Sequence, residues 1–374
     1  MNILVLSWRD PKHPFAGGAE QVMHEHMKGW QKAGHKVTLF SSLFEMAPKI
    51  EIIDGIRVIR GGSQYHLGVQ LKGFFYYLKN RGKYDFVIDQ FHGMPFFTPL
   101  FVFKPKLAVI QETAKKVWFL NPFPQPLRLF YGCLGYVLEP IVYLAYKNTP
   151  IMTGSISAKD DIIKMGISSR NITIIPHGVI ISKSKKICKK EKMKTIIFLG
   201  ILSPDKGIED ALHCFFKLSE LGKYQFWIIG KPESRAYFKY LRNLTERLKI
   251  NNKVKFFGFV SQDKKFELLA RAHILINPSK HEGWGLVNIE ANSVGTPVIA
   301  YKNSGLVDSI LNNKTGIICK ENNPRELAGE VEKLLSKPEK YARLQKSSVA
   351  WSKRFSWEKS KAASLSLINK ISNL

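Results

Sequence analysis

The sequence predicts an α/β protein made of two doubly wound halves, each a mostly parallel sheet covered by helices on both faces. Short apolar runs that end in polar loops alternate with segments of helical spacing along almost the whole chain. A lysine-rich stretch interrupts this alternation once, and the same pattern then begins again. The length of 374 residues also favours two domains over one.

The first half begins with an apolar run at 2–7. We expect a first strand there rather than a signal peptide, because the run has neither a basic segment before it nor a small-residue cleavage site after it. A helix is expected over 19–34, where Gly34 follows the helical spacing as a C-cap. Six further strands are expected, separated mostly by helical stretches, at 35–42, 57–61, 84–90, 106–111, 150–155 and 172–178.

The apolar run 129–146 is long enough to raise the question of a membrane segment. The pair Glu139-Pro140 interrupts it, and two glycines, Gly132 and Gly135, weaken it. We therefore expect a buried or kinked helix of the core. The alternative is a helix with a face that touches a membrane.

The stretch 181–194 holds seven lysines and one glutamate without a hydrophobic period. It is expected to be a solvated linker, with contact to an anionic surface as the alternative. After it, a strand at 195–200 and a helix at 207–222 restart the pattern. The remaining elements of the second half are a helix at 285–295, strands at 224–230, 252–260, 273–279, 296–301 and 315–320, and helices to the end.

Each half thus has the pattern of a Rossmann-like domain. The expected organisation is an N-terminal domain (1–180), the lysine-rich linker (181–194), a C-terminal domain (195–355) and a final helical segment (356–374). Ligands of doubly wound sheets bind at the carboxyl ends of the strands. Two such domains facing each other would form a cleft, and we expect the chemistry in that cleft.

The net charge of +27 favours anionic partners such as phosphorylated metabolites or acidic lipid, although it also fits an overall compositional bias. We expect no nucleic-acid partner, because the chain has no zinc-finger pattern and no aromatic RNA-binding signature. The four scattered cysteines indicate neither a disulfide scaffold nor a zinc site and fit the reducing cytoplasm. No metal ligands and no cofactor are expected.

Three loops carry candidate site residues. Gly17 and Gly18, in the sequence GGAE, stand between the first strand and the first helix, where backbone amides can approach a ligand closely. The motif is neither GxGxxG nor a P-loop, so a dinucleotide enzyme and a P-loop NTPase are unsupported. By itself a Gly-Gly pair is a weak signal.

The second loop, PSKHEGWGL at 278–286, joins a strand to a helix. Glu282 and Glu290 are eight residues apart, which suits one carboxylate in the loop and one on the helix. The amides at the helix start, from Gly285 onward, would be free to hold a phosphate while the carboxylates accept bonds from hydroxyl groups. The alternative is an ordinary acidic helix start.

The third loop, LGILSPDKG at 199–207, places Lys206 between the first strand and the first helix of the second half. A lysine at that point can meet a phosphate. The alternative is a surface lysine.

Together these residues resemble the group 1 glycosyltransferases, the retaining family-four enzymes with the GT-B fold. The matches follow the family's order over nearly the whole chain: GGAE at 17–20, PHGV at 176–179, KG at 206–207, PSKHEGWGL at 278–286, Glu282 with Glu290, and GTPVIA at 295–300. The resemblance implies that the N-terminal domain faces the acceptor, with Gly17 and Gly18 near it. It also implies that the C-terminal domain binds the nucleotide sugar and that the final helix crosses back to the N-terminal domain.

For the site, the resemblance implies that Glu282 contacts the donor sugar and that Glu290 binds the nucleotide ribose. Lys206 and the amides of Gly285, Leu286 and Val287 would hold the diphosphate. Two positions depart from the family: Ile201 stands where arginine is usual, and Gln111 where a histidine is usual at the end of its strand. Glutamine can bond a sugar hydroxyl but cannot shuttle a proton, and His92 is a candidate substitute, with a structural histidine as the alternative.

The expected function is a retaining, metal-independent, hexosyltransferase-type transfer from a nucleoside-diphosphate sugar to a hydroxyl of a sugar or lipid-linked acceptor, in cell-envelope glycan or glycolipid synthesis. The donor is a substrate and no cofactor is needed. Ile201 and Gln111 keep open a degenerate, non-catalytic sugar-nucleotide-binding protein. A sugar-nucleotide epimerase or hydrolase on the same fold is also left open.

The N-terminal half carries the aromatic stretch 74–77 besides the apolar run 129–146. With the net charge of +27, these stretches suggest a cytoplasmic protein that binds peripherally to the anionic inner face of the cytoplasmic membrane. In the opposing interpretation both stretches belong to the core.

Overall fold

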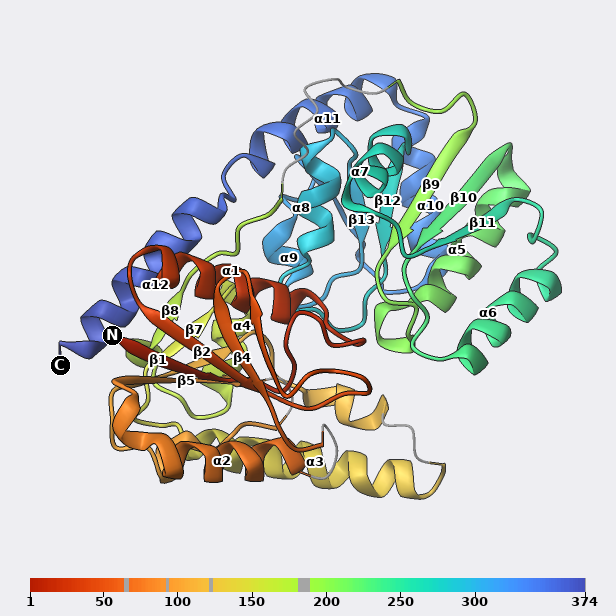
Figure 1. Ribbon diagram of the computed structural model, residues 1–374. Helices are drawn as coiled ribbons and strands as arrows, with labels where there is room; N and C mark the ends of the chain where they lie inside the picture. Colours follow the sequence, from red (N-terminus) through yellow and green to blue (C-terminus); the bar gives the residue numbers. More distant parts are fainter. Residues whose placement is uncertain (64–66, 92–93, 121–123, 181–188, 374) are drawn as a thin grey trace. The chain divides into compact units, whose positions relative to one another are not determined.

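The structure is a computed structural model that describes residues 1–63, 67–91, 94–120, 124–180 and 189–373. The chain divides into two units: unit 1 is formed by Met1–Gly178 and Ser356–Leu374, and unit 2 by Val179–Phe355. Each unit is built on one twisted sheet with helices packed on it (Figure 1).

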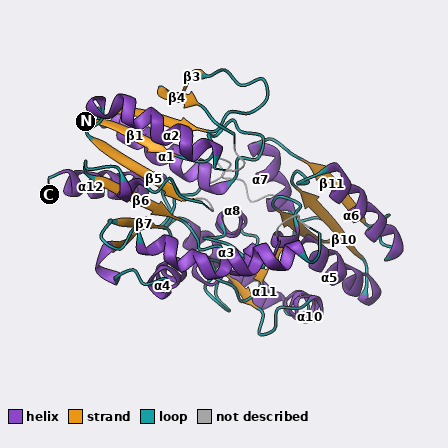
Figure 2. Cartoon of the chain, turned by 90° about the horizontal axis from the view of Figure 1, so that it is seen from below, coloured by secondary structure: helices purple, strands orange, loops and turns teal. Residues whose placement is uncertain are grey.

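Within the described residues, the sheet of unit 1 has eight strands in the order β3-β4-β2-β1-β5-β6-β7-β8. Figure 2 shows β1, β5, β6 and β7 as neighbouring arrows. All pairs are parallel except β3 with β4. The strands are β1 (Asn2–Leu6), β2 (Lys36–Ser41), β3 (Ile50–Ile53), β4 (Ile56–Arg60), β5 (Phe86–Phe91), β6 (Lys106–Ile110), β7 (Ile151–Thr153) and β8 (Ile172–Ile174).

Alternate side chains of β1 enter two different cores, as the period of a strand requires. Ile3 and Val5 pack with α1 (Gly18–Lys32) and with the C-terminal helix α12 (Trp357–Ser372). Leu4 and Leu6 pack with α2 (Gly68–Asn80). Helices α1 and α12 therefore cover one face of the sheet of unit 1 and α2 covers the other.

Helix α12 is fastened to α1 by buried polar contacts as well as by its apolar side chains. The hydroxyl of Ser364 accepts the indole N–H of Trp30 at 3.0 Å and lies 2.9 Å from Nδ1 of His26. The last helix of the chain is thus a structural part of unit 1.

Within the described residues, the sheet of unit 2 has six parallel strands in the order β11-β10-β9-β12-β13-β14. The strands are β9 (Lys194–Leu199), β10 (Tyr224–Ile229), β11 (Val254–Gly258), β12 (Ile274–Asn277), β13 (Val298–Ala300) and β14 (Gly316–Ile318). The helices are α5 (Ile208–Leu221), α6 (Arg235–Arg247), α7 (Gln262–Arg271), α8 (Leu286–Ser293), α9 (Leu306–Ser309), α10 (Pro324–Leu335) and α11 (Pro338–Ser352). The predicted doubly wound α/β class is confirmed in both units.

The structure differs from the sequence expectations in the stretch 181–194. Residues 181–188 lie outside the described residues. Lys190 is not part of a solvated linker, because its Nζ donates to the carbonyl of Ala272 at 2.7 Å and to the hydroxyl of Thr296 at 2.8 Å. The end of the stretch therefore packs on unit 2, and β9 already begins at Lys194.

Helix α3 (Leu127–Leu144) corrects the expectation of a buried helix for the run 129–146. Only 17% of its residues are buried. Among the helices of the described residues, α3 alone has the length and the apolar composition that crossing a membrane requires. Ten of its apolar side chains are exposed: Leu127, Leu129, Phe130, Tyr131, Leu134, Tyr136, Val137, Leu138, Ile141 and Leu144. The aromatic stretch 74–77 is divided, with Phe75 exposed and Tyr77 buried.

Candidate functional site

The candidate donor site lies at the carboxyl edge of the sheet of unit 2. From β9 the chain winds to β10 and β11 on one side, and it returns to β12 on the other side of β9. The pair β9 and β12 is therefore the switch point, the position where doubly wound sheets bind ligands. The loops that follow these two strands are the third and second candidate loops of the sequence.

The two loops touch through their backbones. Gly207 has a φ of +70°, and a Cβ at this position would lie 2.1 Å from the carbonyl oxygen of Pro278. The amide of Lys280 donates to the carbonyl of Asp205 at 2.7 Å. A glycine is needed at 207 because of both its φ and this close approach. The contact joins two motifs more than seventy residues apart into one surface.

On this surface Lys206 and Glu282 form an ion pair. The Nζ of Lys206 lies 3.0 Å from Oε2 of Glu282 and 3.4 Å from the carbonyl oxygen of His281. Both side chains are partly exposed. Partly exposed pairs of this kind contribute little to stability, so a ligand can replace either partner at small cost.

Helix α8 begins at the same surface. Gly285 is its N-cap residue, with a φ of +76°, and Leu286 and Val287 form the first turn. The first amides of a helix have no partner within the helix and carry its positive partial charge. Thus Lys206 and the start of α8 both present positive charge near the switch point.

Two buried asparagines, which sequence reasoning missed, hold the start of α8. The amide nitrogen of Asn277, at the end of β12, donates to the side-chain oxygen of Asn288 at 2.8 Å. The amide nitrogen of Asn288 donates to the hydroxyl of Ser309 at 2.9 Å. A Cβ on Gly285 would lie 2.8 Å from Nδ2 of Asn288. The helix start is therefore fixed by contacts within the protein.

Glu290 is buried on α8 with only 7% of its surface exposed. Its Oε1 lies 2.5 Å from Nζ of Lys265 on α7. Burial raises the pKa of Glu290, and the nearby Lys265 ammonium opposes this rise. Lys265 is a second residue that sequence reasoning missed, since nothing in the spacing of α7 distinguishes it from the neighbouring Lys264.

In unit 1, the GGAE loop is closed on itself. The amide of Gly17 donates to Oε2 of Glu20 at 2.7 Å, and Gly18 is the first residue of α1. The amide of Gly17 is thus occupied by a partner within its own loop in this structure. The side-chain amide of Gln90 donates to the carbonyl of Ala19 at 3.2 Å and ties the loop to β5.

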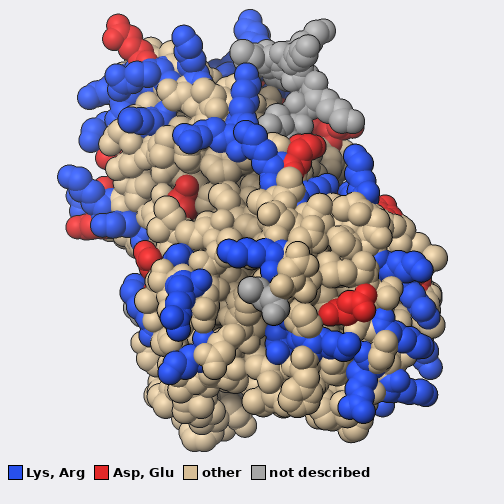
Figure 3. Space-filling model, turned by 90° about the vertical axis from the view of Figure 1, so that its left-hand side faces the viewer, with Lys and Arg blue, Asp and Glu red and all other residues tan. Residues whose placement is uncertain are grey.

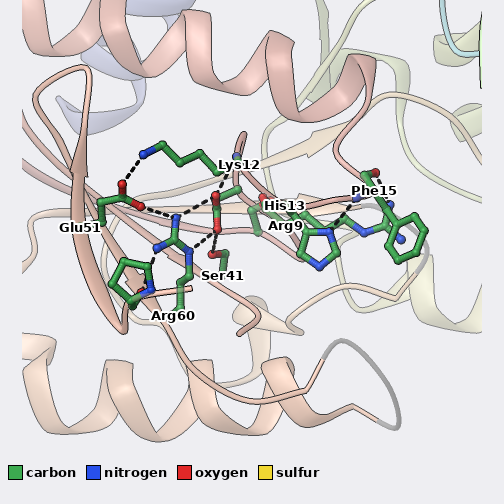
Figure 4. A network of polar contacts seen from close by, with 10 residues as sticks. Arg9, Lys12, His13, Phe15, Ser41, Glu51 and Arg60 are labelled. Carbon is green, nitrogen blue, oxygen red and sulfur yellow. Dashed lines mark hydrogen bonds and ion pairs between the residues drawn. The ribbon is translucent and has the colours of Figure 1, made fainter. Parts of the chain in front are cut away.

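The loop that leads to Gly17 is held by a buried ionic network (Figure 4). Arg60 at the end of β4 donates to Asp10 from Nε at 2.7 Å and from Nη2 at 3.1 Å, and both side chains are fully buried. Ser41 donates to the same carboxylate at 3.0 Å, and Glu51 accepts from Arg60 at 2.9 Å. This two-pronged ion pair fixes the loop after β1.

Gln111 follows β6 and is buried, with 8% of its surface exposed. Neither polar atom of its side chain has a hydrogen-bond partner among the described residues. A buried side-chain amide without a hydrogen-bond partner lowers the stability of the fold. A hydroxyl group or water molecule that forms hydrogen bonds with Gln111 would therefore be bound favourably. His92, the other candidate in this half, lies outside the described residues.

Comparison with known proteins identifies the C-terminal part of the chain most directly. Residues 180–351 match the family model of the glycosyl transferases group 1. An uncharacterised glycosyltransferase of Methanocaldococcus jannaschii is 28% identical over 214 residues, which cover 53% of this chain and 54% of that protein. The chain thus spans about half the length of the curated relatives it matches.

Solved structures agree with the whole fold. Sucrose-phosphate synthase from Thermosynechococcus elongatus superposes with a TM-score of 0.79 at 19% identity, over 99% of this chain and 98% of that chain. HepE of Anabaena in complex with UDP-glucose superposes with a TM-score of 0.73 at 18% identity, over 98% and 99% of the chains. Both units therefore have the architecture expected of the GT-B fold.

Proposed function

Because residues 180–351 belong to the group 1 glycosyl transferases, we propose that the protein is a retaining glycosyltransferase that uses a nucleoside-diphosphate sugar as donor. The observation that carries the proposal is the meeting of Lys206, Glu282 and the start of α8 at the switch point of unit 2. Cations and helix amides suit a diphosphate, and carboxylates suit the hydroxyl groups of a sugar.

In the proposed complex, the diphosphate takes the place of Glu282 as the partner of Lys206. The amides of Gly285, Leu286 and Val287 donate to its oxygens. Glu282, released from the ion pair, accepts bonds from hydroxyls of the donor sugar. Glu290 accepts bonds from the ribose, and the Lys265 ammonium favours the ionised form of this buried carboxylate.

The reaction exchanges one bond at the anomeric carbon for another on the same face of the sugar. The bond to the leaving phosphate oxygen breaks as the acceptor oxygen attacks, and the acceptor proton passes to that phosphate oxygen. Negative charge grows on the nucleoside diphosphate as the bond to the anomeric carbon breaks, before the proton arrives, and Lys206 and the α8 amides stabilise it. This proton path needs no histidine. We propose that Gln111 forms a hydrogen bond with a sugar hydroxyl. His92 is kept as the candidate substitute for the histidine that is usual at position 111.

The acceptor is proposed to be a hydroxyl of a sugar or lipid-linked molecule in cell-envelope glycan or glycolipid synthesis. We place the reaction in the cytoplasm, at the inner face of the membrane. The exposed apolar helix α3 and the net charge of +27 support this assignment. HepE was solved with UDP-glucose, which makes that compound the first donor to test.

The test begins with binding. UDP-glucose, UDP-galactose and GDP-mannose are compared as ligands that raise the melting temperature, since a ligand bound only by the native state stabilises it. A donor that binds is then mixed with candidate acceptors, and transfer is followed by release of the nucleoside diphosphate. Lys206→Ala should abolish stabilisation by the donor, whereas Lys280→Ala, an exposed lysine two residues beyond Pro278, should keep it.

Ile201 and Gln111 favour a second candidate function, which is binding of a sugar nucleotide without catalysis. Ile201 supplies no guanidinium beside the diphosphate, and Gln111 cannot carry a proton. A non-catalytic sugar-nucleotide-binding protein would bind the donor and release no nucleoside diphosphate with any acceptor. An epimerase or hydrolase would consume the donor without an acceptor.

A further inference from the structure

Helix α3 departs from the usual design of a surface helix in a soluble protein. Such a helix turns an apolar stripe to the core and charged side chains to water. Between Leu127 and Leu144 the sequence holds only two charged residues, Arg128 and Glu139, and Glu139 is buried. The outward side of α3 is therefore apolar, and α3 runs with α2 along the lower edge of unit 1 in Figure 1.

The outward stripe follows the helical period. Phe130, Leu134, Val137 and Ile141 are spaced four, three and four residues apart, and they are 61%, 42%, 65% and 59% exposed. Leu127 and Leu138 extend the stripe on one side, and Leu144 extends it on the other. A contiguous exposed apolar surface of this kind marks a site of interaction with a protein or a membrane.

The inward side of α3 is fixed by the short helix η3 (Lys115–Leu120). A Cβ on Gly132 would lie 2.4 Å from the ring of Phe119, and one on Gly135 would lie 2.3 Å from the ring of Trp118. The carboxylate of Glu139 accepts the amides of Ala114 and Lys115 at 2.6 and 2.7 Å. The glycines and the glutamate that weaken the apolar run in the sequence are thus the residues that dock η3.

These contacts make the exposure of the outer stripe a fixed property of the fold. At its C-terminal end α3 is anchored by the buried side chain of Tyr143, with Tyr146 following just beyond it, in the core formed with β6, β7 and α4 (Ile156–Lys164). The chain reaches α3 from β6 and leaves it to β7, and β6 and β7 are paired strands of one sheet. Both ends of α3 therefore return to the same sheet, so the helix cannot cross a bilayer while the sheet is folded. The helix can lie along a membrane surface.

The charge around α3 selects the kind of surface. Residues 104–170, which flank and include α3, hold nine Lys or Arg and four Asp or Glu. Of the four acids, Glu139 is buried on the inward side of α3, and Asp161 is paired with Lys115 and Lys164. In the face shown in Figure 3, the lowest rim is largely uncharged and Lys and Arg gather above it. An apolar face bordered by cations complements an anionic lipid surface.

We propose that the outward face of α3 docks unit 1 on an anionic phospholipid bilayer, with the helix in the plane of the interface. Phe130, Leu134, Val137 and Ile141 enter the acyl boundary, and the flanking lysines and arginines meet the headgroups. Through Glu139 and the segment 112–120, α3 is joined to the end of β6, where Gln111 is located. That the membrane presents the acceptor to Gln111 rests on the proposed function; the docking itself does not.

The first experiment measures co-sedimentation with vesicles of phosphatidylglycerol and phosphatidylcholine and with vesicles of phosphatidylcholine alone. The protein should bind the anionic vesicles, and binding should weaken as NaCl rises above about 0.1 M. The double variant Val137→Gln/Ile141→Gln should bind at least about tenfold more weakly. The matched control is Leu221→Gln, because Leu221 is 56% exposed at the end of α5 in unit 2.

The second experiment reports where the lipid lies. Cys133 is exposed on α3, whereas Cys214 and Cys319 are buried. In a Cys188→Ser background, a polarity-sensitive fluorophore on Cys133 should shift to the blue when anionic vesicles are added. The same fluorophore on Leu221→Cys, with Cys133 and Cys188 both replaced by serine, should not shift.

The two readouts need no donor and no acceptor, so they separate the docking proposal from the proposed reaction. Failure of the protein to bind anionic vesicles, or equal binding by the glutamine double variant with an unchanged melting temperature, would overturn the proposal. So would a stable dimer in solution that dissociates in the double variant, since a second copy of the chain would then cover α3.

Discussion

Replacement of Lys265 by methionine should destabilise unit 2 strongly near neutral pH. The Nζ of Lys265 lies 2.5 Å from Glu290, whose side chain is almost fully buried. Removal of one partner of a buried ion pair costs about 3–5 kcal/mol, because the remaining charge is left without compensation. At roughly 2–4 °C per kcal/mol for a unit of this size, the melting temperature should fall by about 6–20 °C.

The loss should depend on pH in a defined direction. Burial raises the pKa of Glu290, and loss of Lys265 removes the group that opposes this rise. The native state then binds a proton more readily than the unfolded chain, so the free energy of unfolding falls as pH rises through the folded pKa. Urea unfolding should therefore show a smaller deficit for Lys265→Met at about pH 5 than at about pH 7.

Two variants control this experiment. Lys265→Met/Glu290→Gln removes both charges and should recover most of the lost stability. Lys264→Met changes a neighbouring lysine that pairs with Glu267 on the surface, and its effect should stay within about 1 kcal/mol. Equal destabilisation of the single and double Lys265 variants, or a deficit that grows on acidification, would refute the buried-pair reasoning.

Three further predictions test the site and its supports. Lys206→Ala should lower the rate of nucleoside-diphosphate release during transfer by about 100-fold or more, since its ammonium faces the leaving group, whereas Lys280→Ala should change it less than about twofold; equal rates for the two variants would make Lys206 a surface lysine. Gly207→Ala should lower the melting temperature by more than a surface substitution does, because its Cβ would lie 2.1 Å from a carbonyl oxygen of the facing loop; an unchanged melting curve would contradict that geometry. Arg60→Met should cost about 3–5 kcal/mol in urea unfolding by leaving the Asp10 carboxylate buried and unpaired, and Asp10→Asn in the same chain should restore part of it; no rescue would speak against the ion pair as the cause.

The elements that sequence reasoning predicted best are those whose own residues specify them. The buried parallel strands are apolar runs bounded by loops. Helix α1 follows Gly17 and has Glu20 in its first turn, and α8 follows Gly285. The short strand β3 was missed, because its four residues pair antiparallel at the edge of the sheet and carry no helix after them. A run of four residues is too short for a periodic signal.

The candidate site was predicted as a set of residues, and the structure adds their partners. Lys206 and Glu282 meet because β9 and β12 are adjacent, an order of strands that no local pattern encodes. Lys265 and Asn288 were not predicted for the same reason. Lys265 acts through its contact with Glu290, and Asn288 through its contact with Asn277. Helix α3 was expected in the core because apolar composition does not reveal which side of a helix another element covers.

The position of α12 in unit 1 has a consequence for the order in which the two units fold during synthesis. Met23, Met27 and Trp30 of α1 pack with residues of the last helix, which leaves the ribosome only after all of unit 2 has been made. Domains generally fold as units during translation, the N-terminal one first. Unit 1 is the first unit whose synthesis begins, but it is the last that can complete its folding. Unit 2 can therefore finish folding while the face of α1 that packs with α12 is still uncovered. A released chain that ended before residue 357 would thus contain all of unit 2 and leave unit 1 uncovered along α1.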